Sequence, residues 1–76
     1  MGVSSEQRSD SLLALKLDEV SATLMYVGEA AAGSATASAV WRIKRIDTTS
    51  GIDLRWADGN IHFDNVWDNR ASLTYL

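Results

Sequence analysis

The sequence predicts a mainly β protein, a small antiparallel sheet or barrel-like domain of about four strands with a flexible or helical N-terminal arm. Two stretches of alternating apolar and charged residues flank a turn-forming segment, which is typical of a hairpin. Other stretches rich in β-branched and aromatic residues end in turn-forming residues. Because 76 residues suffice for one small core, we expect an arm over residues 1–20 and one β domain over residues 21–76.

Composition excludes several classes of protein. The chain has no Cys and no Pro, so neither disulfides nor a Cys-ligated zinc can support its core. Hydrophobic residues make up 46% and charged residues 22%, a balance that predicts a folded chain rather than a disordered one. A net charge of −3 argues against nucleic acid and anionic membranes as partners. No apolar run approaches the ~20 residues of a membrane span, so we expect a soluble, unprocessed protein.

The N-terminal segment has an arm-like start followed by an ambiguous element. Residues 1–11 are rich in Ser and charged side chains, which favours a tail. In the next segment Leu13, Leu15 and Leu17 alternate like a strand, whereas Leu13, Leu17 and Val20 fall on one helical face. Periodicity does not decide between the two, but Leu and Ala favour a helix. We therefore predict a helix from Ser11 to Glu19.

A strand and a loop are predicted next. The segment Ser21 to Gly28 is rich in β-branched and aromatic residues and closes with Gly, as strands often do. The following segment, Glu29 to Ser38, contains mostly Ala, Gly, Ser and Thr, whose side chains are too small to fill a core. We predict a surface connection there, or a segment that lets another backbone approach closely.

The clearest local pattern is a hairpin over Ala39 to Ala57. Trp41 and Ile43 alternate with basic residues, the turn-forming string DTTSG follows, and a second alternation runs through Ile52, Leu54 and Trp56. We expect each strand to place its Trp and aliphatic residues on one buried face and its charges, Arg42, Lys44, Asp53 and Arg55, on the other.

The remaining residues predict a turn, a helical turn and a last strand. Asp58 to Asn60 combines residues that accept left-handed backbone geometry. Between Ile61 and Arg70, aromatic residues at near-helical spacing alternate with Asp and Asn, which predicts a short helical turn. The segment Ala71 to Leu76 predicts a terminal strand with Leu73 and Tyr75 on one face.

No pattern in the sequence predicts catalysis, cofactor binding or a metal centre. Acidic and amide side chains cluster at Asp58, Asn60, Asp64, Asn65, Asp68 and Asn69. Their spacing is not that of a calcium-binding EF-hand loop, so turn and capping roles are favoured over calcium binding. His62 is the single His and has no nucleophile arranged beside it. The glycines are scattered rather than set in a phosphate-binding motif.

The aromatic residues predict a core, with an interface as the alternative. Basic residues beside a Trp, here Arg42, Lys44 and Arg45, can bind single-stranded nucleic acid. We favour instead the neutralisation of these basic side chains by carboxylates on neighbouring segments, such as Asp47 and Asp53, over nucleic-acid binding. Large aromatic side chains dominate both cores and interfaces. The residues that we assign to the core or an interface are Trp41, Ile43, Leu54, Trp56, Phe63, Trp67, Leu73 and Tyr75.

A composite pattern runs through the last two-thirds of the chain: Y-x-G-x-A, a small-residue stretch, A-x-W-x-I-x-R/K, W-A-D-G and F-x-N-x-W-x-x-R-x-x-L-x-Y. It covers Tyr26, Gly28, Ala30, Ala39, Trp41, Ile43, Lys44 or Arg45, Trp56 to Gly59, and Phe63 to Tyr75. In this pattern the chain resembles a group of short proteins encoded by tailed bacteriophages. Residues 1–20 lie outside the match.

The resemblance implies a setting in the virion and brings no catalytic residues. A small β domain with a limited core gains stability from repeated contacts with other chains. We therefore expect a non-enzymatic structural component of a tailed-phage virion, tail-associated or fibre-associated in preference to capsid-decorating. Its expected partners are other virion proteins and further copies of itself, assembled in the host cytoplasm. The alternative is a non-virion accessory or assembly factor that binds another protein.

Overall fold

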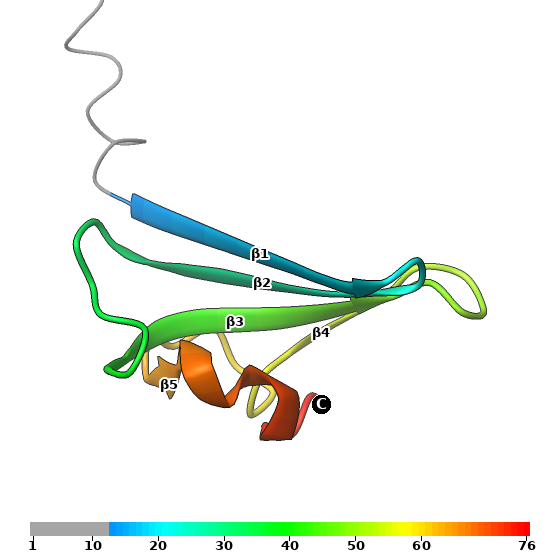
Figure 1. Cartoon of the computed structure of the whole chain (residues 1–76). Coiled ribbons are helices and arrows are strands. Elements are labelled where there is room, and N and C mark those ends of the chain that lie inside the picture. The colour runs from blue at the N-terminus through cyan, green and yellow to red at the C-terminus, as the bar shows by residue number, and fades with distance from the viewer. Residues whose placement is uncertain (1–12) are drawn as a thin grey trace, which may run out of the picture.

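The protein folds into a four-stranded antiparallel meander with one face covered by the C-terminal segment (Figure 1). The computed structural model describes residues 13–76, and the predicted mainly β class is confirmed. Neighbouring strands follow sequence order, β1-β2-β3-β4, and β5 pairs with the start of β3. The elements are β1 (Leu13–Ser21), β2 (Leu24–Ala31), β3 (Ala39–Asp47), β4 (Asp53–Trp56), β5 (Asn65–Val66) and the 3-10 helix η1 (Trp67–Ser72).

The helix predicted for Ser11 to Glu19 is wrong over its described part. Residues from Leu13 onward form strand β1, which pairs with β2 from Leu13 opposite Ala31 to Ser21 opposite Leu24. The alternation of Leu residues agrees with this pairing, and the ladder hydrogen bonds to β2 outweigh the helix propensity of Leu and Ala, which is small in energy compared with tertiary contacts. Residues 13–20 therefore belong to the sheet and not to an arm, while the predicted arm over residues 1–12 lies outside the described residues.

Strand β2 is displaced from its predicted bounds. It begins at Leu24, because the Ser21 hydroxyl accepts a hydrogen bond from the Thr23 amide in the tight turn after β1. It continues to Ala31, so Glu29 lies in the sheet opposite Leu15 and Arg42 and not in the predicted loop. The small-residue connection is thus confined to residues 32–38.

The predicted hairpin is confirmed, but its two Trp residues lie on opposite faces of the sheet. Lys44 pairs with Trp56, and Ile46 pairs with Leu54. Directly opposed residues share a face and successive residues alternate, so Trp56 lies on the face opposite Trp41. The loop between Asp47 and Asp53 sets this register, and a shift by one residue would reverse it.

The C-terminal segment forms a turn and a 3-10 helix, and the strand predicted for Ala71 to Leu76 is wrong. The turn contains Asp58 and Gly59 at φ 61 and 72, the predicted left-handed geometry. Helix η1 runs to Ser72, and only Tyr75 then bridges to Ala57 in a single ladder step. The Tyr75 hydroxyl donates to the Arg70 carbonyl at 2.8 Å, which holds the chain end against the helix instead of along a strand.

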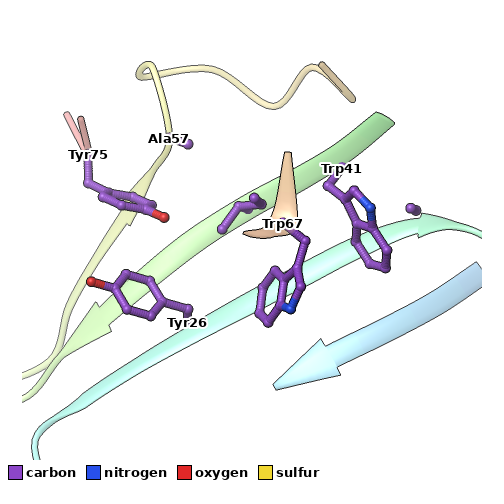
Figure 2. Close-up of a cluster of buried hydrophobic side chains, with 7 residues drawn as sticks. Tyr26, Trp41, Ala57, Trp67 and Tyr75 are labelled. Atoms are coloured by element: carbon purple, nitrogen blue, oxygen red, sulfur yellow. The ribbon is translucent and has the colours of Figure 1, made fainter. Parts of the chain in front are cut away.

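The core lies between the sheet and the C-terminal segment (Figure 2). Trp41 and Trp67 pack with ring centroids 5.9 Å apart, and Tyr26 and Tyr75 pack at 5.6 Å. Gly28 lies directly beneath the Trp67 ring, leaving no room for a side chain. The cluster consists of Tyr26, Ala30, Trp41, Ile43, Ala57, Trp67 and Tyr75. We call this side of the sheet the covered face.

A polar contact joins the first strand to the covering segment. The Arg70 Nε donates to Asp18 Oδ2 at 2.8 Å, and the same guanidinium stacks 4.6 Å from the Trp67 ring centroid.

Among residues 13–76, β1 and β4 do not pair with each other, so the sheet is open and not a closed barrel.

Alkaline pH should destabilise the fold through Tyr75. Burial raises the pKa of Tyr75 above its ordinary value of 10.0. The unfolded chain therefore loses this proton first, so the stabilising effect of the neutral phenol is complete below pH 10 and declines as the pH rises above it. Thermal melts between pH 8 and 11 should show a steeper decline for the wild type than for Tyr75→Phe. Equal declines would contradict the assigned burial.

Candidate functional site: the open face of the sheet

No other strand or helix of residues 13–76 covers the face of the sheet opposite the core (Figure 1), although the Phe63 ring, from the loop after β4, lies over Arg42 on this face. We call it the open face. Its members follow from the strand register, in which directly opposed residues share a face. They are Leu13, Leu15, Leu17 and Glu19 on β1, Met25, Val27, Glu29 and Ala31 on β2, Val40, Arg42, Lys44 and Ile46 on β3, and Leu54 and Trp56 on β4.

The outer strands give the open face an apolar surface. Leu15 and Leu17 are 61% and 63% exposed, and Leu54 on the far strand is 47% exposed. In contrast Val27, at the centre, is buried although it does not belong to the core cluster, so its open-face neighbours screen it from water. A solvated sheet face normally carries polar side chains, so this one has the composition of a contact surface.

A polar array crosses the middle of the open face. Arg42 Nε donates to Glu29 Oε1 at 2.9 Å. The Arg42 guanidinium also lies 4.7 Å from the Phe63 centroid and 5.3 Å from the Trp56 centroid. Lys44 Nζ lies 5.2 Å from the same Trp56 ring. Cations over aromatic rings are attracted by the ring quadrupole, so Arg42 and Lys44 hold the Trp56 and Phe63 rings in place. Arg42 also neutralises the charge of Glu29.

An apolar hollow opens at the end of the open face where β1 starts. Its volume is about 420 Å³, and it is lined by Leu13, Ala31, Ser34, Val40 and Phe63. All the lining residues except Ser34 have apolar side chains, so the hollow suits an apolar side chain of a neighbouring protein better than a polar ligand.

The structure divides the predicted core or interface residues between the two faces. Trp41, Ile43, Trp67 and Tyr75 are buried together, and Leu73 packs against them. The other three lie elsewhere: Leu54 and Trp56 on the open face, and Phe63 beside Arg42 at 45% exposure. The eight residues therefore do not form one core, because the hairpin register turns β4 away from the core cluster, and the interface alternative for the other three stays a prediction.

The basic residues are paired differently from the expectation. Asp53 binds its neighbour Arg55 at 3.0 Å, and Asp47 lies opposite Asp53 at the hairpin end. The partner of Arg42 is instead Glu29 on β2. A hydrogen bond from the Thr49 backbone amide lowers the pKa of Asp47, which keeps this carboxylate charged beside its acidic neighbour.

The polar cluster after β4 makes local turn contacts. The Asn60 side-chain oxygen accepts a hydrogen bond from the His62 amide at 2.9 Å, and Asn65 Nδ2 donates to Asp64 at 3.2 Å. The first is the contact of an Asx turn, and the second joins the side chains of adjacent residues. Within residues 13–76, no three His, Cys, Asp or Glu side chains gather as a metal site would require.

Several open-face residues are not placed by the sequence alone. Its patterns predict a helix for the Leu residues of β1 and a loop for Glu29, whereas both lie in strands. The alternation of Leu13, Leu15 and Leu17 was the signal for the strand, and it becomes decisive once β2 is long enough to pair with all of it. The pairing of Glu29 with Arg42 had no local signal, because these residues meet only across two strands.

No family model, curated protein or solved structure matches the chain. Among the described residues, no helical segment has the length and apolar character needed to cross a bilayer.

Proposed function

We propose that the chain is a non-enzymatic structural component of a tailed-phage virion, tail-associated or fibre-associated in preference to capsid-decorating, which assembles with other virion proteins through its open face. The observation that carries the proposal is the arrangement of apolar side chains. One face of the sheet holds the core, while the other leaves Leu15, Leu17 and Leu54 exposed. The phage setting is supported by the resemblance of residues 26–75 to short phage proteins.

Assembly has a physical rationale in this chain. The core cluster contains seven residues, two of them Ala, which is little buried surface for a free-standing domain. Binding that occurs only in the folded state adds to stability in proportion to the logarithm of partner concentration. A particle that holds the domain against neighbours therefore supplies stability that its own core lacks.

Incorporation into particles tests the proposal. Leu54→Asp places a charge on the open face, on the strand farthest from β1, and should lower the copies per purified particle at least about tenfold by introducing an unpaired charge into a contact. The readout is quantitative mass spectrometry of particles grown with the variant as the sole copy.

Ile52→Asp is the matched control. Ile52 is 84% exposed and lies in the hairpin loop outside the open face, so its variant should be incorporated like the wild type. Both variants should melt within a few degrees of the wild type, since exposed substitutions cost little. Equal incorporation of both would contradict an open-face contact. Exclusion of the wild type from particles would favour the accessory or assembly-factor alternative.

A further inference from the structure

Strand β1 is the long free edge of the sheet. It spans nine residues, Leu13–Ser21, and within residues 13–76 it pairs only with β2. Its register is regular up to Glu19, and its one irregularity lies between Glu19 and Ser21. Strand β4 at the other edge has only four residues. An unpaired edge carries a row of free backbone N–H and C=O groups, so β1 is the edge at which another strand can be added.

We propose that β1 pairs antiparallel with β1 of a second copy, about a two-fold axis through Leu17, to form one continuous sheet. The inference deepens the proposed function by naming a second copy as one partner of this chain in its assembly. The interface is isologous, the commonest symmetry of protein dimers.

Symmetry restricts the possible registers of this pairing. A two-fold axis that relates two antiparallel strands of one sheet is perpendicular to that sheet, so each residue lies opposite a residue whose side chain is on the same face. The axis must therefore pass between the two copies of one residue. When it passes through Leu17, Leu13 faces Ser21 and all nine residues pair without overhang.

The charges of β1 favour the same register. With the axis at Leu17, Lys16 of each copy faces Asp18 of the other, which gives two attractive cross-strand pairs. An axis at Lys16 opposes two lysines, and an axis at Asp18 opposes two aspartates, both of which are unfavourable. Of the described strand, an axis at Leu15 pairs only residues 13–17. The fully overlapped register is thus also the charge-complementary one.

Both charged groups are available for this contact. Lys16 is exposed, and its ammonium has no ion pair with any carboxylate of residues 13–76. Asp18 binds Arg70 through Oδ2 alone, and within the same part of the chain its Oδ1 accepts no hydrogen bond. A second cation can therefore approach Asp18 without displacing Arg70.

A cysteine placed at the axis tests the register directly. The chain has no Cys, so Leu17→Cys introduces a single thiol that faces its own copy, with Cα atoms about 4.5 to 5.5 Å apart, within disulfide range. In Leu15→Cys, which is equally exposed, the two thiols would lie about 14 Å apart along the paired strands. Mild oxidation of the purified chain should cross-link Leu17→Cys at least about tenfold faster.

Equal cross-linking of the two variants, or faster cross-linking of Leu15→Cys, would overturn the register. That result is expected if two open faces stack on each other. Failure of both variants to cross-link, with a monomeric mass in sedimentation, would overturn the pairing itself. These experiments use purified chain, so such a failure together with normal particle incorporation would leave the proposed function standing.

A charge exchange provides an independent test. In K16E each new carboxylate faces Asp18 of the other copy, and in D18K each new ammonium faces Lys16, so each variant alone should dimerise at least about tenfold more weakly. In an equimolar mixture the K16E–D18K heterodimer has both attractive pairs, so the mixture should sediment as a dimer like the wild type. A mixture that stays as monomeric as its components, with both chains folded by circular dichroism, would contradict the proposal.

Discussion

Replacing Trp41 with alanine should leave the domain unfolded at room temperature. Trp41 is fully buried between the sheet and Trp67, and its indole N–H donates to the Ala35 carbonyl at 2.9 Å. Truncating a buried Trp costs about 3 to 5 kcal/mol, and the orphaned carbonyl adds to this cost. Small domains have roughly 5 kcal/mol or less of net stability. Loss of the cooperative transition in thermal and urea melts followed by circular dichroism is the expected result.

Trp56→Ala is the matched control for that experiment. The substitution is the same, but Trp56 is only half-buried and lies on the open face. Its cost should be about 1 to 2 kcal/mol, from lost cation–π contacts and partial burial, so the variant should retain a cooperative melt at a lower midpoint. A wild-type-like melt for Trp41→Ala, or equal losses for the two variants, would show that the core is assigned to the wrong face.

Gly28→Ala should have the second largest effect, although it adds a single methyl group. A Cβ on Gly28 would lie against Trp67 Cε3, 2.6 Å from Trp67 Cζ3 and 3.2 Å from Trp41 Cε3. These atoms belong to rigid rings packed in the core, so the tryptophans must shift. Overpacking of this kind costs about 1 to 3 kcal/mol, which should appear as a lower urea midpoint at an unchanged m value.

A double-mutant cycle identifies the cause of that loss. Trp67→Leu removes the ring that the new methyl would strike, so adding Gly28→Ala to Trp67→Leu should cost at least about 1 kcal/mol less than adding it to the wild type. Additive costs would indicate a backbone effect of Gly28 rather than a steric clash.

Local patterns in the sequence were sufficient to predict some elements and insufficient for others. The hairpin was predictable because alternation and the DTTSG turn lie within a few residues of each other. The left-handed turn at Asp58 and Gly59 was predictable from residue type alone. By contrast, β1 is decided by pairing with β2, and single-sequence propensity favoured a helix there.

The candidate site was less predictable than the fold, because it depends on register. Trp41 and Trp56 carry similar local patterns, yet one is buried and the other lies on the open face. A loop of one residue more or fewer would turn Trp56 to the covered face, while Trp41 would stay there because β3 is also paired with β2. The strand predicted for Ala71 to Leu76 is wrong for a related reason. The alternation of Leu73 and Tyr75 indicates a strand, but Tyr75 contacts Arg70 and Ala57 and forms no ladder.

The number of copies of the wild-type chain in purified phage particles tests the account most directly. Mass spectrometry with isotope-labelled standard peptides gives this number relative to the major capsid protein. We expect retention at fixed stoichiometry through high-salt washing, with a few to a few tens of copies per particle for a tail or fibre position. A chain that is abundant in the infected cell but absent from washed particles would contradict the structural role.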